Sequence, residues 1–343
     1  MEQQLRVGII GCGRPWKSEG ATGFGMSREH AKGYLKADCR LVALADLSRE
    51  NAEAFQKDIG GDQIFTDYRQ MLAEARPDIV SISTWPRLHT EMVLAAAEAG
   101  ARAVHCEKPM ALTFGESRQM VDVCAARGVQ LTFNHQRRFN VPFRTVRQLL
   151  RDGRIGKLAR IEMKCGNLYD WGTHWFDMMF FYNDEQPAEW VIGQIDTRDT
   201  KDVFGAPCEG QGLTHVKFTN DVRATMVSGY QAEIGAQHRL VGSEGQIELG
   251  DGDVVRLWAK GQSDWETVAM PAGGGHDLGA VATGVVDLID ALRAGREPEL
   301  SGRRALAATE LIFGTYESSR RRGRVDLPLT ITDSPLMDML GRQ

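Results

Sequence analysis

The stretch LRVGIIGCG, residues 5–13, decides the fold of this chain. It is a short apolar run of the kind that is buried on both faces, and it ends in Gly11-Cys12-Gly13, where the backbone can turn tightly and approach a pyrophosphate. Further apolar runs predict strands at residues 40–45, 78–83, 101–106 and 129–133, with segments of helical spacing between them. This alternation predicts a parallel, doubly wound sheet that binds ligands at its carboxyl edge.

The pattern changes after Arg137. A helix at 139–151 is followed by short β-rich segments joined by tight turns, at residues 157–165, 187–197, 211–219, 222–231, 236–241 and 245–249. These predict a largely antiparallel open sheet with helices on one face, closed by late helices at 277–294 and 303–319. We therefore expect an α/β protein with a dinucleotide-binding domain at 1–136 and an α+β domain for substrate binding and oligomerisation at 137–343.

Charge and cysteine usage narrow the class of protein. The 343 residues carry 41 basic and 46 acidic side chains, a net charge of −5, and no basic run longer than Arg320-Arg321-Arg322, so no nucleic acid partner is expected. The 6 cysteines lack Cys-x-x-Cys spacing and are interpreted as reduced thiols in a cytoplasmic protein. We expect no membrane partner, because no apolar run approaches roughly 18 residues and no targeting leader precedes the first strand.

The loop after the first strand is unusually long. Residues 14–22 separate Gly13 from Gly25, where a helix is expected to begin, so we interpret the segment as an enlarged phosphate loop with Gly25 as its third glycine. Arg14 or Lys17 would add positive charge for a pyrophosphate. An ordinary glycine-rich surface loop is the alternative.

Asp46 favours NAD over NADP. It follows the expected strand at 40–45, about 20 residues beyond Gly25, where a carboxylate accepts a hydrogen bond from a ribose hydroxyl. The same charge repels a 2′-phosphate. Arg49, three residues further along, would instead favour NADP. The alternative is that Arg49 is a solvated residue in the first turns of a helix.

Glu107-Lys108-Pro109 comes directly after the strand at 101–106. A lysine at the carboxyl edge of the sheet can bind a substrate hydroxyl and stabilise negative charge on its oxygen during hydride loss. The alternative is a surface lysine paired with Glu107.

The run DWGTHWFD, residues 170–177, supplies a second group of reactive side chains. Its first half is expected to be a loop and its second half the start of a helix, so Asp170 and His174 can converge on one pocket. Histidine exchanges protons near neutral pH, and Asp177, one helical turn later, could orient the ring. A helix-capping Asp170 and a packed core His174 are the alternatives, and no metal is expected.

These three motifs, in this order, resemble those of the Gfo/Idh/MocA oxidoreductase family. Smaller matches run along nearly the whole chain, at His30, Thr84 to His89, residues 136–139, residues 153–156 and residues 242–245. The resemblance implies a Rossmann domain, a second α/β domain whose open sheet often forms the subunit interface, and substrates that are sugars, inositols or their derivatives. The insertion at 14–22 and Trp85-Pro86, where the family usually has Pro-Asn, depart from its pattern.

The resemblance also implies roles for individual residues. Lys108 would contact the reacting hydroxyl, His174 would accept its proton, and Asp170 would assist His174 or bind a neighbouring hydroxyl. Together with the loop residues, the expected cofactor contacts are Gly11, Gly13, Arg14, Gly25, Met26, Asp46, Thr84, Trp85, Pro86, His89, Glu107 and Lys108. The further expected substrate contacts are Gln136, Arg137, Tyr169 and Trp171. Arg138 could instead form an ion pair on the surface.

The leading hypothesis is an NAD-dependent dehydrogenase that oxidises a secondary hydroxyl of a sugar, cyclitol or sugar derivative, assembled as a homodimer or homotetramer. An enzyme that cleaves or epimerises glycosides with transient use of bound NAD, and a non-catalytic NAD-sensing protein, are the two alternatives.

Overall fold

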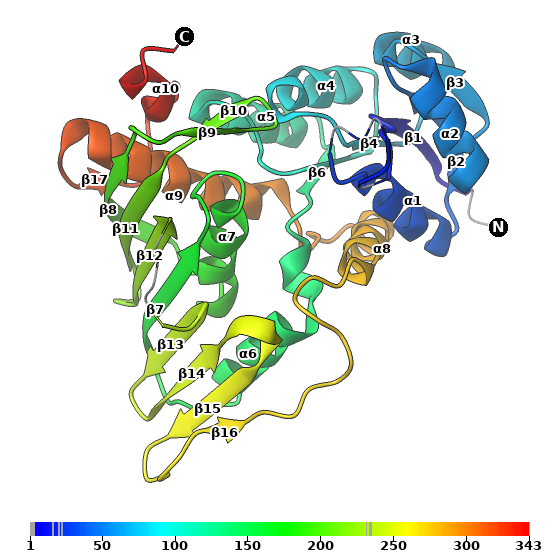
Figure 1. Cartoon of the computed structure of the whole chain (residues 1–343). Helices are drawn as coiled ribbons and strands as arrows, with labels where there is room; N and C mark the ends of the chain where they lie inside the picture. Colours follow the sequence, from blue (N-terminus) through cyan, green and yellow to red (C-terminus); the bar gives the residue numbers. More distant parts are fainter. Residues whose placement is uncertain are drawn as a thin grey trace. The chain divides into compact units, whose positions relative to one another are not determined.

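The chain forms two compact units (Figure 1). The computed structural model describes residues 4–15, 17–19, 21, 23–230, 232 and 235–342. The first unit is made of Met1–Leu112, Glu116–Gln136 and Leu278–Leu306, and the second of Thr113–Gly115, Arg137–Asp277 and Ala307–Gln343. Each unit has its own sheet.

The first unit contains the predicted parallel sheet. Its strands are β1 (Arg6–Ile10), β2 (Arg40–Ala45), β3 (Gln63–Phe65), β4 (Ile79–Ile82), β5 (Ala103–Cys106) and β6 (Gln130–Phe133). They are all parallel and lie in the order β3-β2-β1-β4-β5-β6, so their carboxyl ends share one edge. The order reverses between β1 and β4, which is where doubly wound sheets bind ligands. The fold class is confirmed, and within this sheet β3 is the strand that the sequence pattern did not predict.

Helices cover both faces of this sheet. They are α1 (Met26–Lys36), α2 (Arg49–Ile59), α3 (Tyr68–Ala75), α4 (Pro86–Glu98), α5 (Phe114–Ala126) and α8 (Gly279–Ala294). On one face Val7 and Ile9 pack with Tyr34 of α1 and Phe55 of α2. On the other face, residues from β1, β4 and β5 pack with α3, α4 and α5. Because the sheet is buried on both faces, the sequences of these strands are continuous apolar runs.

Helix α8 departs from the expected domain arrangement. We expected 137–343 to form one continuous domain, whereas Leu278–Leu306 groups with the first unit. The reason is apolar packing, because Val285, Leu288 and Ile289 of α8 are buried in the same core as α1. The absence of a side chain at Gly33 allows this approach, since a Cβ there would lie 2.5 Å from Cβ of Val285.

The second unit is built on a mixed sheet. Within the described residues its order is β16-β15-β14-β13-β7-β12-β11-β8-β17. The strands are β7 (Leu158–Cys165), β8 (Ala188–Asp196), β11 (Gln211–Phe218), β12 (Arg223–Gly229), β13 (His238–Gly242), β14 (Gly245–Leu249), β15 (Val255–Ala259), β16 (Glu266–Thr267) and β17 (Val325–Asp326). Only the β12–β7 pair in this sheet is parallel among the described strands, so the predicted largely antiparallel sheet is confirmed.

The remaining elements lie mainly in the second unit. They are the 3₁₀ helices η1 (Gln136–Phe139) and η2 (Asp251–Asp253), the helices α6 (Val141–Arg151), α7 (Gly172–Tyr182), α9 (Gly302–Arg321) and α10 (Pro335–Met339), and the hairpin of β9 (Lys201–Val203) and β10 (Ala206–Cys208). The last residue of the strand predicted at 222–231 lies outside the described residues.

The cysteines are all buried and unbridged, as expected for reduced core thiols. In the described part of the chain, none of the helices combines the length and the apolarity that crossing a bilayer requires.

Candidate active site

The turn after β1 has the geometry of a dinucleotide-binding loop. Gly11 has φ of 84°, and a Cβ there would lie 2.6 Å from the carbonyl oxygen of Ser83, so only glycine fits. Gly25, with φ of 67°, is the N-cap of α1, and a Cβ there would lie 2.7 Å from the carbonyl oxygen of Arg14. At both positions the close approach of neighbouring backbone and the positive φ require glycine. The helix begins at Met26, as predicted, whereas residues 16, 20 and 22 of the long loop lie outside the described residues.

Asp46 lies beside this turn at the end of β2. Its carboxylate accepts hydrogen bonds from the backbone N–H of Gly13 (3.0 Å) and of Ser48 (2.9 Å). Arg14 donates from Nε to Asn51 Oδ1 at 2.8 Å, on the same side of the sheet. Arg49, in contrast, is 64% exposed at the side chain and forms an ion pair with Glu53 along α2.

Two residues that stabilise the glycine turn were not singled out as site residues from the sequence. Ser27 Oγ donates to the carbonyl oxygen of Cys12 at 2.6 Å. Buried Arg28 donates from Nη1 to the carbonyls of Cys12 (3.1 Å) and Gly13 (3.2 Å). The sequence could have indicated both residues, because they lie in the first turn of the helix that follows Gly25.

The segment after β4 is held by a buried histidine. Thr84 and Trp85 precede α4, Pro86 is its first residue, and the Trp85 ring is 37% exposed. His89 is fully buried, and its ring contacts the carbonyl oxygens of Thr84, Pro109 and Met110 at 3.0 to 3.1 Å. Burial lowers the pKa of His89, despite these carbonyls. The structure thus gives His89 a positioning role between the Thr84 and Pro109 segments.

Glu107 is the centre of a buried polar network at the end of β5. Its Oε1 contacts His30 Nε2 at 2.9 Å and accepts from Asn134 Nδ2 at 2.7 Å, while its Oε2 accepts from the backbone N–H of Lys108 at 3.2 Å. Burial alone would raise the pKa of Glu107, but His30, Lys108 and Asn134 together hold it below the ordinary value. The carboxylate therefore stays charged directly beside Lys108, which is half-buried.

In the second unit, Asn167 organises the start of α7. Its Oδ1 accepts from the backbone N–H groups of Asp170 (2.7 Å) and Trp171 (3.2 Å), and its carbonyl accepts from Gly172 N at 2.8 Å. These bonds satisfy N–H groups that a helix start leaves without partners. Asn167 was missed, although asparagine just before a helix is a typical capping residue.

The predicted reactive residues lie around this helix start. Asp170 is half-buried and precedes α7, whereas His174 lies in its first turn and is 5% exposed. Tyr169 is buried, and Trp171, at the N-cap, is 39% exposed.

Asp177 and Arg138 form a buried ion pair, which corrects two expectations. Arg138 donates from Nε and Nη2 to the two carboxylate oxygens of Asp177 at 2.8 and 2.7 Å, and it also contacts Glu185. Neither Arg138 nor Asp177 is more than 1% exposed at the side chain. Asp177 therefore neutralises Arg138 and does not orient His174, and Arg138 does not pair on the surface, because helix packing places both side chains inside the unit.

Arg137 lies in an aromatic cluster next to the same helix. Its Nη2 contacts His276 Nδ1 at 3.0 Å, and its guanidinium carbon lies 5.8 Å from the centre of the Trp175 ring. The Trp171 ring meets His276 edge-on at 6.0 Å. His276 is thus a further site candidate that the sequence did not reveal, because it lies in the loop before α8, far along the chain. Gln136, the neighbour of Arg137, begins η1.

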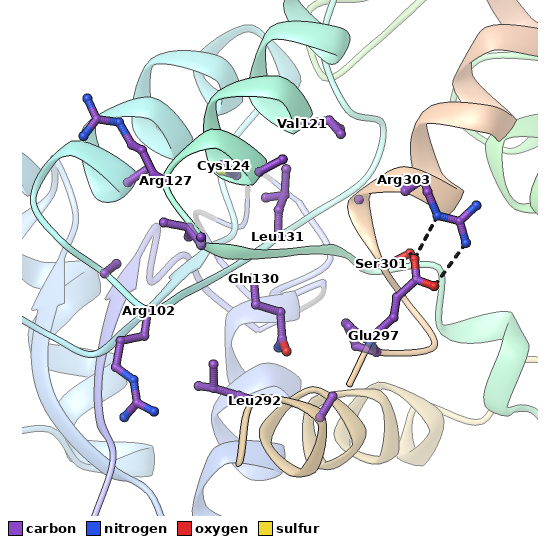
Figure 2. A pocket seen from close by; sticks show the side chains of 18 of the residues that line it. Arg102, Val121, Cys124, Arg127, Gln130, Leu131, Leu292, Glu297, Ser301 and Arg303 are labelled. Carbon is purple, nitrogen blue, oxygen red and sulfur yellow. Dashed lines mark hydrogen bonds and ion pairs between the residues drawn. The ribbon is translucent and has the colours of Figure 1, made fainter. Parts of the chain in front are cut away.

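A groove of about 930 Å³ in the first unit lies elsewhere (Figure 2). It is lined at the amino ends of β5 and β6 by Arg102 and Gln130, and at the end of α8 by Glu297. Figure 2 shows Glu297 bonded to Ser301 and Arg303. Because the dinucleotide turn lies at the opposite edge of the sheet, this groove is not the cofactor site.

Comparisons with known proteins agree with this geometry. Residues 5–135 match a family model described as "Oxidoreductase family, NAD-binding Rossmann fold". D-apiose dehydrogenase of Paraburkholderia graminis is 27% identical over 362 residues, which cover 97% of this chain and 92% of that protein. D-glucoside 3-dehydrogenase of Escherichia coli is 32% identical over 174 residues, 49% of this chain and 46% of that protein.

A solved structure of levoglucosan dehydrogenase, in complex with NADH and levoglucosan, has the same fold. Its TM-score is 0.79 at 20% identity, and the match covers 95% of this chain and 100% of that chain. The glycine turn, the acid after β2 and the Glu-Lys-Pro segment after β5 lie where this fold binds its dinucleotide. Residues 5–135 are thus similar to the NAD-binding Rossmann domain of the Gfo/Idh/MocA family of oxidoreductases.

Proposed function

We propose that this protein is an NAD-dependent dehydrogenase that oxidises a secondary hydroxyl of a sugar, cyclitol or sugar derivative. The names of its relatives support this substrate class, because they include D-apiose, D-glucoside and inositol dehydrogenases. Asp46 supports NAD rather than NADP, since its carboxylate lies at the end of β2 and would repel a 2′-phosphate.

One observation carries the proposal. The Gly11 turn, Asp46 and Lys108 follow β1, β2 and β5, which are parallel strands of one sheet, so all three lie at its carboxyl edge. A bound nicotinamide supplies the hydride acceptor. The buried Glu107 carboxylate fixes the backbone of Lys108 at that edge through the 3.2 Å hydrogen bond.

The chain's own residues have distinct roles in this proposal. The Lys108 ammonium binds the reacting hydroxyl and stabilises negative charge on its oxygen. His174 takes the hydroxyl proton, and Asp170 assists it or binds a neighbouring hydroxyl. The Asn167 cap holds the backbone of Asp170 and so keeps the start of α7 in one conformation.

The test is NADH release from a panel of sugars and cyclitols, with NAD⁺ and NADP⁺ compared. We expect activity with NAD⁺, and we expect Lys108→Met and His174→Asn each to lower kcat by about 10² to 10⁴-fold, the usual contribution of acid–base groups. NADH binding, followed by fluorescence, should persist in both variants. Lys57→Met, an exposed lysine of α2, is the matched control. Near-wild-type rates in either site variant would refute its assigned role.

The same panel distinguishes the alternatives. Substrate consumption without net NADH, by a protein that purifies with bound cofactor, would indicate a redox-neutral epimerising or glycoside-cleaving enzyme. Retained NAD affinity without turnover of any compound would indicate an NAD-sensing protein.

The proposal includes self-association through the open face of the large sheet. Thr214 of β11 points to α9, where it hydrogen-bonds Thr315 at 3.0 Å, whereas its neighbour Leu213 points to the other face and is 49% exposed. Ile192 of β8 is 44% exposed on that face as well. Exposed apolar residues on an uncovered sheet face support a homodimer or homotetramer, which we place in the cytoplasm.

A further inference from the structure

Among the residues that the structure describes, no carboxylate forms an ion pair with the buried cation of Arg137. The residue is 8% exposed, and its hydrogen bond within the described residues is the one to His276 Nδ1. Its Nε is enclosed and has no acceptor there. Because Nδ1 of His276 accepts this bond, His276 is a neutral imidazole and cannot balance the positive charge.

The residue next to it shows how this protein treats a buried arginine that serves only the fold. Arg138 has two oxygens of Asp177 and the carboxylate of Glu185 around it. Around Arg137, in contrast, lie the Trp175 ring and the imidazoles of His276 and His238. The His238 ring is neutral as well, because its burial, helped by the charge of Arg137, lowers its pKa to about 3. The two adjacent arginines are both buried, at 8% and 1% exposed, but only Arg138 is compensated by carboxylates within the described residues.

The carboxylate whose charge acts on Arg137, Asp253, is hydrogen-bonded to the backbone instead of to the guanidinium. Asp253 influences Arg137 through its charge, but its Oδ2 accepts the backbone N–H of Gly275 at 2.7 Å, and it forms no ion pair with the guanidinium within the described residues. Burial lowers the pKa of Arg137 to about 10, which agrees with a cation that lacks a counter-ion. Leaving a buried charge unpaired is costly, so a missing anionic partner is the physical explanation.

The location of Arg137 identifies that partner. Its guanidinium carbon lies 5.8 Å from the centre of the ring of Trp175, which directly follows His174 in the first turn of α7. The N-terminus of this 11-residue helix favours negative charge. The exposed rings of Trp171 and His276 meet at the surface beside it. An anion bound to Arg137 would therefore belong to the molecule on which His174 acts.

We propose that Arg137 binds an oxyanion of the substrate, a carboxylate or a phosphate, so the substrate class is an acidic sugar derivative. This inference rests on the proposed dehydrogenase function and on the role of His174. Arg137 is then a specificity residue, and its planar guanidinium suits a two-oxygen anion better than an ammonium does.

The experiment compares matched sugars on the NADH-bound enzyme by calorimetry, and on the NAD⁺-bound enzyme by turnover. D-glucuronate and D-galacturonate provide the carboxylate, D-glucose 6-phosphate provides the phosphate, and D-glucose and D-galactose are the neutral partners. The variants are Arg137→Met, Arg137→Lys and, as matched control, Arg144→Met, an exposed arginine of α6. We expect at least one anionic sugar to bind wild type at least tenfold more tightly than its neutral partner. Arg137→Met should remove that preference, Arg137→Lys should retain part of it, and Arg144→Met should leave it unchanged.

A structural role for Arg137 predicts different results. It would make Arg137→Met unfold at a lower temperature and weaken neutral and anionic sugars alike, whereas loss of an unpaired buried cation should leave the unfolding midpoint unchanged or raise it. The proposal is overturned if no anionic sugar exceeds its neutral partner on wild type, or if Arg137→Met keeps the preference.

The two proposals fail separately. NADH from neutral sugars without an anion preference would leave the dehydrogenase function standing, whereas Arg137-dependent anion binding without NADH would leave only the anion site standing.

Discussion

At the residue scale, buried charges decide which side chains serve the fold and which remain for chemistry. Glu107 is balanced by His30 and by Asn134, and Arg138 by Asp177 and Glu185. The charges of Glu107 and Arg138 are therefore compensated within the fold and do not call for a charged ligand. For Arg137, whose guanidinium forms no ion pair with a carboxylate among the described residues, we propose a partner on the substrate.

The Arg138–Asp177 pair gives a stability prediction. Asp177→Asn leaves the guanidinium with Glu185 as its remaining carboxylate, so we expect the free energy of unfolding to fall by about 3 kcal/mol, near the lower end for a broken buried pair. Urea unfolding measures this loss. Asp196→Asn, at an exposed pair with Arg198, is the control and should change stability little. Equal effects of the two variants would contradict the assigned role of the buried pair.

His238 gives a pH prediction. Burial, helped by the charge of Arg137, lowers its pKa from 6.5 to about 3, so the unfolded chain binds a proton below pH 6.5 that the native chain refuses. Stability from the neutral ring is complete above pH 6.5 and is lost as the pH falls from 6.5 towards 3. By pH 5 the loss should be about 2 kcal/mol.

The check compares urea unfolding of wild type and His238→Gln at pH 7.5 and pH 5. The substitution keeps an oxygen or amide near Tyr182 Oη, which lies 3.1 Å from His238 Nδ1. We expect the variant to lose less stability on acidification than wild type. Parallel losses in the two proteins would exclude His238 as the titrating group.

At the scale of elements, close helix packing depends on single small residues. Helices α1 and α8 are more than 200 residues apart along the chain but share one core. Gly33→Ala would place a Cβ 2.5 Å from Cβ of Val285, so we expect overpacking to cost about 1 to 3 kcal/mol and to lower the thermal midpoint. Gly323→Ala adds a methyl group with no atom within 4 Å and serves as control. If both variants melted alike, the α1–α8 contact would not limit stability.

At the scale of the whole molecule, the uncovered face of the large sheet predicts association between copies. Ile192→Arg combined with Leu213→Arg places two charges among exposed apolar residues, and we expect the measured molar mass in light scattering to fall towards 38.0 kDa. Leu35→Arg, at a 47% exposed position of α1, should not change the mass. Wild type that is already monomeric would refute the proposed interface.

The sequence by itself determined the local and periodic features. The parallel sheet and its carboxyl edge were predicted from apolar runs that end in Gly11-Cys12-Gly13 or precede Glu107-Lys108. This was possible because a strand buried on both faces is a continuous apolar run, and a tight backbone turn needs glycine, so both features depend on neighbouring residues only. Asp46 was placed by the same spacing.

Only the tertiary structure decided which distant residues meet. It assigned α8 to the first unit, gave Asp177 to Arg138, brought His276 to Arg137, and put His89 on backbone carbonyls. A side chain's partner depends on packing between segments far apart in the chain, and one sequence records the residue types but not which of them the folded core brings together.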